Sequence, residues 1–125
     1  MFLTPLRVER IDDRRWRLTG PLAWSDGEGN RLMVPVGFVT DFASIPGWLP
    51  KSFDVAQPAA VLHDWLYQTH ERTKGQADRI FWRAMTDLEE PWWRKQILYQ
   101  AVRWFGGPAY ASGPERCRTE CEATL

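Results

Sequence analysis

The sequence predicts an α+β fold in which a small antiparallel sheet is followed by three helices packed on it. Apolar and polar residues alternate before residue 40, as is typical of half-buried strands. After residue 57, apolar residues recur every three or four positions, as is typical of amphipathic helices. A chain of 125 residues suffices for one ordinary domain. We expect this domain to occupy residues 1–110 and a loosely ordered, charged tail to occupy residues 111–125.

Two hairpins are expected in the N-terminal half. Residues 6–18 alternate on either side of Asp12-Asp13-Arg14, a polar tripeptide typical of turns. Residues 22–36 form the second hairpin, whose loop is the glycine-containing segment SDGEGN. Pro35 has no amide hydrogen to donate to a neighbouring strand, so it should lie at a strand edge or end.

Three helices are expected after residue 57. The first begins at Pro58, because proline is favoured in the first turn of a helix, where its missing amide hydrogen costs nothing. The second covers about residues 76–88. The third covers about residues 92–105 and is ended by Gly106-Gly107-Pro108.

The tryptophan content is high, at eight residues in 125. Trp93, Ile97, Ala101 and Trp104 form an apolar stripe along the third predicted helix. We expect the tryptophans mainly to fill the core, where each can bury on the order of 150–250 Å². Exposed tryptophans would instead be natural anchors for a partner protein. The tryptophans considered for such a role are Trp24, Trp48, Trp65, Trp82, Trp92 and Trp93.

Charge and hydropathy exclude several classes of protein. Sixteen basic and sixteen acidic residues give a formal net charge of zero, which argues against a general nucleic-acid binder. No run approaches the roughly 20 apolar residues that a membrane span needs. The N-terminal segment MFLTPLRVER is too short and too polar for a signal peptide, so we expect a cytosolic product. Cys117 and Cys121 lie in the charged tail and are expected to be free thiols.

Most of the reactive side chains lie where the strand pattern gives way to the helical pattern. The segment VPVGFVTDFASIP spans residues 34–46, and AAVLHDWLY spans residues 59–67. The short charged connection at 70–75 would let the next helix pack antiparallel, which would bring Asp78 back toward them. The polar side chains of this candidate site are Thr40, Asp41, Ser44, His63, Asp64, Tyr67 and Asp78.

Adjacent residues His63 and Asp64 can offer a metal one imidazole nitrogen and one carboxylate oxygen. Because neighbouring helical side chains point about 100° apart, the ion would have to lie at the helix edge. Asp78 and Asp41 are the further candidate ligands. One histidine with two or three carboxylates would suit Mg²⁺, Mn²⁺ or Zn²⁺. The same residues could instead be structural, as a packed histidine and as capping or turn carboxylates.

A hydrolytic triad is a second interpretation of the same region. Ser44, His63 and an aspartate supply the three residue types that such a triad needs. Ser44 does not lie in a nucleophile-elbow sequence, and many serines, histidines and aspartates would pass so loose a test. The sequence therefore favours the metal site over the triad.

Three ordered motifs resemble a family found in phages and prophages, known as domain of unknown function 1353. Its pattern Pro-x-Gly-Phe-x-Thr-Asp-Phe-Ala-Ser-x-Pro corresponds to residues 35–46. His-Asp-x-Leu-Tyr corresponds to residues 63–67, and Ala-Asp-x-x-Phe-x-x-Ala-Met to residues 77–85. The resemblance covers roughly residues 31–105. It implies a phage or prophage origin and supplies no established activity.

Two functions are compatible with these observations. The first is a small hydrolase-like enzyme in which a metal held by His63, Asp64, Asp78 and Asp41 lowers the pKa of a bound water. Its candidate catalytic residues are Asp41, Asp64 and Tyr67. The second is a non-enzymatic virion, tail-associated or assembly protein that binds other phage proteins or a host protein. Either protein would act in the host bacterial cytoplasm or be incorporated in the virion.

Overall fold

Two small antiparallel sheets make up the N-terminal half of the computed structural model, which describes residues 1–42 and 44–113. Of the tail predicted at residues 111–125, residues 114–125, with Cys117 and Cys121, lie outside the described residues, and residues 111–113 are helical. One sheet has three strands in the order β1-β2-β5, and the other pairs β3 with β4. The strands are β1 (Val8–Arg10), β2 (Trp16–Leu18), β3 (Leu22–Ser25), β4 (Arg31–Val34) and β5 (Val39–Thr40).

Both predicted hairpins are present. In the first, the Asp12 carboxylate accepts hydrogen bonds from the backbone N–H groups of Arg14 and Arg15, which closes the turn between β1 and β2. In the second, the Asp26 carboxylate accepts the N–H groups of Glu28 and Asn30 in the loop between β3 and β4. Strand β4 ends at Val34, immediately before the proline at position 35, as its lack of a donor requires.

The strands form two sheets, where a single sheet of about four strands was expected. After β4 the chain turns at Gly37, whose φ of 93° is readily adopted only by glycine. Gly37 then donates its N–H to the carbonyl of Leu18, and Leu18 donates to the carbonyl of Phe38. These bonds place β5 beside β2, so the first hairpin gains a third strand and the second hairpin stays separate.

The helices follow the predicted order, with two additions. They are η1 (Lys51–Ala56, a 3-10 helix), α1 (Gln57–Thr69), α2 (Lys74–Asp87) and α3 (Trp92–Phe105), and residues 107–113 are also helical. Helix α2 begins before the predicted residue 76 because Thr73 and Gln76 form a capping box. No helix in the described part of the chain is long and apolar enough to cross a membrane.

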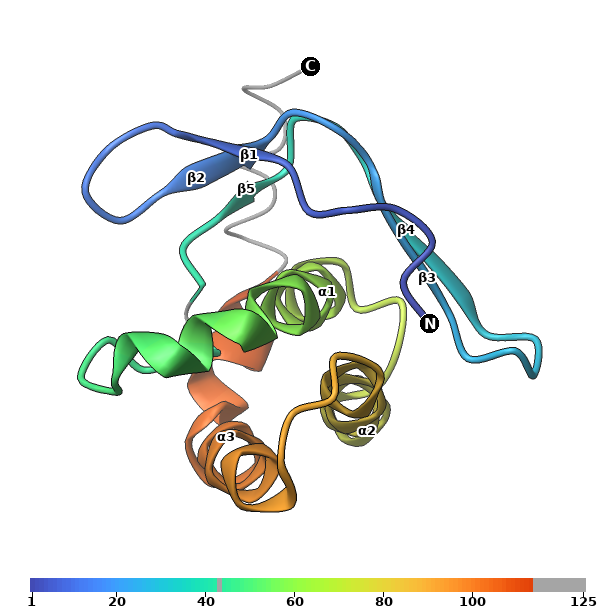
Figure 1. Ribbon diagram of the computed structural model, residues 1–125, viewed down its shortest axis with the longest axis vertical. Helices are drawn as coiled ribbons and strands as arrows, with labels where there is room; N and C mark the ends of the chain where they lie inside the picture. Colours follow the sequence, from blue (N-terminus) through green and yellow to red (C-terminus); the bar gives the residue numbers. More distant parts are fainter. Residues whose placement is uncertain (43, 114–125) are drawn as a thin grey trace.

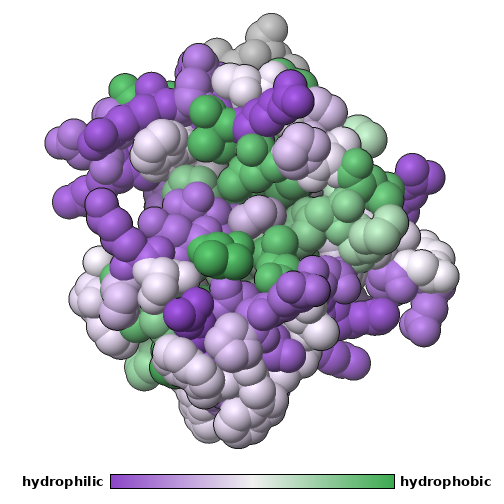
Figure 2. Space-filling view, in the orientation of Figure 1, coloured by the Kyte–Doolittle hydropathy of each residue, from purple (hydrophilic) through white to green (hydrophobic). Residues whose placement is uncertain are grey.

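Helix α1 lies between the two layers of the fold (Figure 1). It packs against β4 and β5 on one side and against α2 on the other, and α2 in turn packs against α3. Figure 2 shows hydrophobic residues gathered across the middle of the molecule, and hydrophilic residues over the tip of the β1–β2 hairpin. The largest fully buried side chains include Trp24, Phe81, Leu62, Leu66 and Met85.

The expectation that tryptophans mainly fill the core is wrong. Only Trp24 is fully buried, and it donates its indole N–H to Asp87 at the end of α2. The residues that α3 buries are Leu98 and Val102, whereas Trp93, Ile97 and Trp104 of its predicted stripe are exposed. The exposed tryptophans are Trp48, Trp92, Trp93 and Trp104. Aliphatic side chains on the inner face permit a close approach of α3 to α2, which indoles would prevent.

Gly106, at the end of α3, lies too close to α1 to carry a side chain. A Cβ atom there would lie 2.7 Å from the Tyr67 hydroxyl oxygen and would also meet the carbonyl of Val102. Replacing Gly106 by alanine should therefore lower the free energy of unfolding by about 1–3 kcal/mol, through the strain of overpacking. Urea unfolding followed by circular dichroism measures this loss.

The matched control for that variant is Gly75→Ala. Gly75 lies inside α2, and a Cβ there would meet nothing within 4 Å. Alanine should stabilise this position by up to about 1 kcal/mol, because it has the higher helix propensity. Equal effects of the two substitutions would contradict the close packing at Gly106.

Candidate functional site

One loop and two helices bring the candidate site together. Ser44 lies in the loop between β5 and η1, and His63 and Tyr67 lie one turn apart on α1. Asp78 lies one turn into α2, and the short connection at 70–73 lets α2 fold back beside α1. His70, at the end of α1, adopts a left-handed conformation with φ 56°, which ends the helix and reverses the chain. Asp78 is thereby brought to His63, as the short connection predicted.

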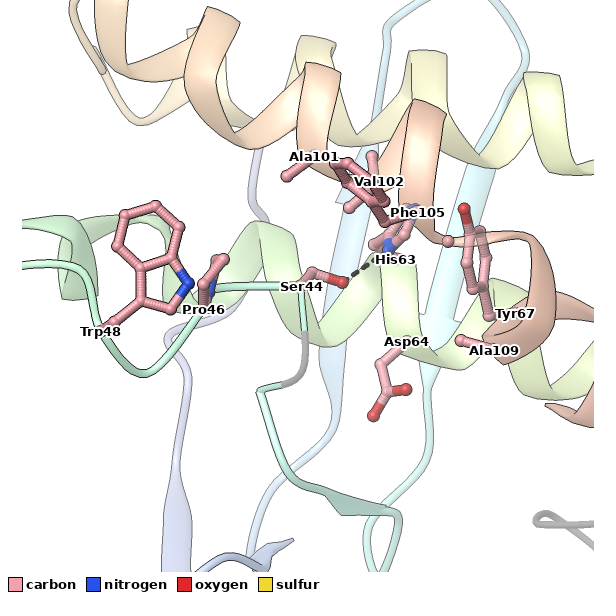
Figure 3. A pocket seen from close by; sticks show the side chains of 11 residues that line it. Ser44, Pro46, Trp48, His63, Asp64, Tyr67, Ala101, Val102, Phe105 and Ala109 are labelled. Carbon is pink, nitrogen blue, oxygen red and sulfur yellow. Dashed lines mark hydrogen bonds between the residues drawn. The ribbon is translucent and has the colours of Figure 1, made fainter.

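A chain of hydrogen bonds links Ser44, His63 and Asp78. The Ser44 Oγ lies 2.6 Å from His63 Nδ1, and His63 Nε2 lies 2.7 Å from Asp78 Oδ1. Figure 3 shows the Ser44 hydroxyl pointing at the imidazole of His63. All three residues are buried, with exposed fractions of 7% for Ser44, 1% for His63 and 2% for Asp78.

Two further side chains donate to Asp78. The Tyr67 hydroxyl donates to Oδ1 at 2.6 Å, and the Lys74 ammonium donates to Oδ2 at 2.9 Å. Lys74 also donates to the backbone carbonyls of Val102 and Arg103, at 2.9 and 3.2 Å. One ammonium group therefore connects the start of α2 to the end of α3.

These hydrogen bonds fix the ionisation of Asp78. Burial acts to raise its pKa, but hydrogen bonds from His63, Tyr67 and Lys74 outweigh burial and hold the pKa below its ordinary value of 3.8. Burial and the neighbouring carboxylate both raise the pKa of Tyr67. At neutral pH, Asp78 is therefore an ionised acceptor and Tyr67 is a protonated donor.

The protonation of His63 follows from its two neighbours. Burial lowers the pKa of His63 below 6.5, although the Asp78 carboxylate acts in the opposite direction. The neutral ring carries one proton, and an ionised carboxylate can only accept, so that proton lies on Nε2 and faces Asp78. Nδ1 is then an acceptor, and the Ser44 hydroxyl donates to it. A serine hydroxyl bonded to the free nitrogen of a neutral, oriented imidazole is arranged for general-base activation.

The Ser44–His63 pair lines a pocket of about 390 Å³, between Trp48 and Pro46 on one side and Tyr67 and Ala109 on the other (Figure 3). The polar residues that line it are Ser44, His63, Asp64 and Tyr67. Its apolar walls come from the loop before η1, from α3 and from the helix at 107–113 (Figure 3). These wall residues are Pro46, Trp48, Ala101, Val102, Phe105 and Ala109. A mostly apolar cleft of this volume with a few convergent polar groups is typical of small-molecule sites.

The residues predicted as metal ligands do not all meet. His63 and Asp78 are in contact, but Asp64 accepts a hydrogen bond from the Thr40 hydroxyl at 2.9 Å, on the side of β5. Asp41 is exposed and lines a separate hollow beside the β1–β2 turn. Across residues 1–42 and 44–113, no three His, Cys, Asp or Glu side chains are grouped as metal ligands. Both ring nitrogens of His63 are already hydrogen-bonded, so this arrangement does not fit the predicted ion.

Ser44 was ranked below the metal ligands in the sequence analysis, and Lys74 was not predicted. Ser44 is turned inward by a tight loop in which Ile45 donates its N–H to the carbonyl of Phe42, and Phe42 donates its own to the Thr40 hydroxyl. Phe42 adopts φ 54°, a left-handed conformation that no sequence pattern announces. Lys74 had a usable signal, because it precedes Asp78 by four residues on one helical face.

Protonation of the buried groups should make stability depend on pH. Between the lowered pKa of His63 and 6.5, the unfolded chain binds more protons than the folded one, so the free energy of unfolding should fall as the pH drops below about 6.5. Asp78 adds a second loss below 3.8, as the pH falls through its lowered folded pKa. Urea midpoints measured from pH 8 to pH 3 test this dependence.

Two histidine variants identify the group responsible. His63→Gln should remove the loss that begins near pH 6.5, whereas His70→Gln should retain it, because His70 is exposed. A stability that stays constant from pH 8 to pH 5 in the wild-type protein would contradict a buried, neutral His63.

The fold and site define an α+β domain with a buried Ser–His–Asp hydrogen-bond chain beside an apolar pocket. Residues 16–102 match the family described as Protein of unknown function (DUF1353), and the chain belongs to this family. It is also 31% identical, over 96 residues, to the uncharacterized protein y4jT of Sinorhizobium fredii (strain NBRC 101917 / NGR234). The match covers 73% of this chain and 29% of that relative, so the chain corresponds to less than a third of the relative's length. No solved structure matches the chain.

Proposed function

We propose that the protein is a hydrolase that uses Ser44 as a nucleophile on an ester or amide carbonyl. The observation that carries this proposal is the hydrogen bond of 2.6 Å from the Ser44 hydroxyl to His63 Nδ1, with Asp78 on the opposite ring nitrogen. Serine, base and orienting carboxylate are recognised by their roles and not by their order in the sequence. Here the serine bonds Nδ1 and the carboxylate bonds Nε2, which exchanges the two ring nitrogens relative to the serine-protease triad. Their position beside an apolar pocket gives a substrate a place to bind.

The reaction would proceed in two steps, acylation of Ser44 and hydrolysis of the acyl-enzyme. In the first, Ser44 Oγ bonds to the carbonyl carbon and its proton passes to His63 Nδ1. The imidazolium then protonates the alcohol or amine as the bond to the acyl carbon breaks. In the second step a water oxygen attacks the acyl carbon, its proton passes to His63, and His63 returns a proton to Ser44 Oγ as the acid leaves. Asp78 remains ionised throughout and stabilises the transient imidazolium.

This proposal keeps the hydrolase predicted from the sequence but assigns the nucleophile to a side chain instead of a metal-bound water. A phage or prophage origin is also part of the proposal, on the strength of the motif resemblance. A location in the host cytoplasm or in the virion is part of the proposal for the same reason. The substrate of a longer relative would not transfer to this chain, because the two share only part of that relative's length.

Covalent labelling tests the proposal. An alkyl fluorophosphonate should phosphonylate Ser44, with loss of fluoride, and intact-mass measurement followed by peptide mapping locates the adduct. Ser52 lies on the exposed side of η1 and serves as the internal control, because it should stay unmodified. Labelling should proceed at the same rate with and without EDTA, because no metal takes part in activating Ser44.

The results of this labelling distinguish the serine mechanism from the metal-dependent mechanism. Labelling that EDTA abolishes and Mn²⁺ or Zn²⁺ restores would favour the metal site and overturn the assignment made to Ser44. The absence of an adduct on Ser44, in protein shown by circular dichroism to be folded, would overturn the serine mechanism.

Exposed aromatic residues favour a second candidate function, that of an interaction protein. On α3, Trp92, Trp93, Trp104 and Phe105 have exposed fractions of 66%, 52%, 73% and 82%. Aromatic side chains that are exposed to this extent are suited to anchor a partner protein, which would be another phage protein or a host protein. In this function the Ser–His–Asp chain is a structural network, and the fluorophosphonate experiment leaves Ser44 unlabelled.

A further inference from the structure

The walls of the pocket determine what kind of acyl group Ser44 can receive. Pro46 and Trp48 lie on the loop side, and Ala101 and Phe105 lie on the α3 side (Figure 3). An acyl group bonded to Ser44 Oγ would lie against these side chains. Burial of apolar surface against them is favourable, so the walls select for an apolar group.

The charges around the pocket select against an anionic group. Asp64 lines it, and the ionised Asp78 lies behind His63. Lysine and arginine are absent from the described residues that line the pocket, and the ammonium of Lys74 is held by Asp78 and by two α3 carbonyls. A substrate carboxylate would therefore lose its hydration beside negative charge, which is costly.

The size of the pocket bounds the acyl group. Its volume is about 390 Å³. Small-molecule sites typically measure about 300–1,000 Å³, so this pocket lies at the small end of that range. Two of the wall residues, Trp48 and Phe105, are 80% and 82% exposed, so their side chains are not packed in the core and are available for contact with an acyl group.

We propose, resting on the serine mechanism above, that the site is selective for neutral esters or amides with an apolar acyl group that fits this volume. A hexanoyl group meets these conditions, whereas an acyl group of similar length that ends in a carboxylate does not. Ala101 is the wall residue at which a larger side chain would shorten the space available to the substrate.

Binding without reaction is the first experiment. In the Ser44→Ala variant, hexanamide and the anionic succinamate are titrated and followed by two-dimensional NMR. Hexanamide should perturb the backbone signals of Ala101 and Ala109 and bind at least tenfold more tightly than succinamate. This measurement does not require Ser44 to act as a nucleophile.

Turnover of p-nitrophenyl esters is the second experiment. The value of kcat/KM should be at least tenfold higher for the hexanoate than for the mono-ester of glutarate, which carries a carboxylate. Ala101→Phe should lower the ratio of the hexanoate value to the acetate value at least tenfold, because the larger side chain shortens the space for the longer acyl group. The matched control is Gln100→Phe, on the neighbouring position of α3 outside this pocket, and it should change neither value.

The two proposals fail in different ways. Equal binding of hexanamide and succinamate, or an Ala101→Phe variant with an unchanged hexanoate preference, would overturn the selectivity even where Ser44 is labelled. Hexanamide binding in the pocket of a protein whose Ser44 does not react would overturn the serine mechanism and support the ligand class.

Discussion

Replacing Ser44 by alanine should lower kcat/KM for p-nitrophenyl butyrate by at least ~10³-fold, because the nucleophile of the proposed reaction is lost. His63 and Asp78 would remain in place, since their mutual hydrogen bond does not involve the serine. The variant should also lose about 1–3 kcal/mol of stability, because Nδ1 of the buried His63 loses its donor. Initial rates are therefore measured at a temperature at which circular dichroism shows the variant to be folded.

Ser52→Ala is the control for this substitution. Ser52 is exposed on η1, and its replacement should leave both the rate and the melting temperature nearly unchanged. If Ser44→Ala retained more than about a tenth of the wild-type kcat/KM, hydrolysis by Ser44 would be disproved. If the wild-type protein showed no hydrolytic activity and Ser44→Ala were less stable, the Ser44–His63–Asp78 hydrogen bonds would be structural.

Replacing Asp78 by alanine should produce the largest loss of stability, about 3–5 kcal/mol. The carboxylate accepts hydrogen bonds from His63, Tyr67 and Lys74, and its removal leaves the buried donors of His63 and Tyr67 without their acceptor. Because such a loss can unfold a small domain, Asp78→Asn is the companion variant. It keeps one acceptor oxygen but turns an amide N–H₂ group toward a donor, so its stability should lie between those of the wild type and the alanine variant.

The control for Asp78 is Asp54→Ala in η1. Asp54 is exposed, so its replacement should change the free energy of unfolding by no more than about 0.5 kcal/mol. Urea unfolding at pH 7 measures all three variants. An Asp78→Ala protein with nearly wild-type stability would contradict the central position given to this carboxylate.

Local patterns predicted the elements, because periodicity and turn chemistry depend on residues close in sequence. The bounds of α3 follow from Pro91 and from the glycines after Phe105. Which face of α3 is buried could not be predicted from local patterns. Both an aromatic face and an aliphatic face run along α3, and only contact with α2 decides that Leu98 and Val102 are buried. Tertiary packing decided which apolar face points inward.

The site was predictable where it depends on helix geometry, and not where it depends on a loop. His63 and Tyr67 share a helical face, and a short connection returns Asp78 to that face. The pairing of His63 with Asp64 allowed for the angle of about 100° between adjacent side chains by placing the ion at the helix edge, but Asp64 instead accepts a hydrogen bond from Thr40 on β5. Ser44 depends on the left-handed conformation of Phe42, which the sequence does not encode in a readable form.

Lys74 has a consequence for how the pocket can change shape. The wall formed by α3 is joined to the acidic end of the Ser–His–Asp chain through this one ammonium group. Moving α3 outward to admit a large substrate would stretch the bonds from Lys74 to α3 or to Asp78. Loss of the bond to Asp78 would raise the proton affinity of the carboxylate. The width of the pocket and the proton affinities of Asp78 and His63 are therefore linked through Lys74, because Lys74 acts to lower both pKa values. A substrate that fits without displacing α3 leaves both proton affinities unchanged.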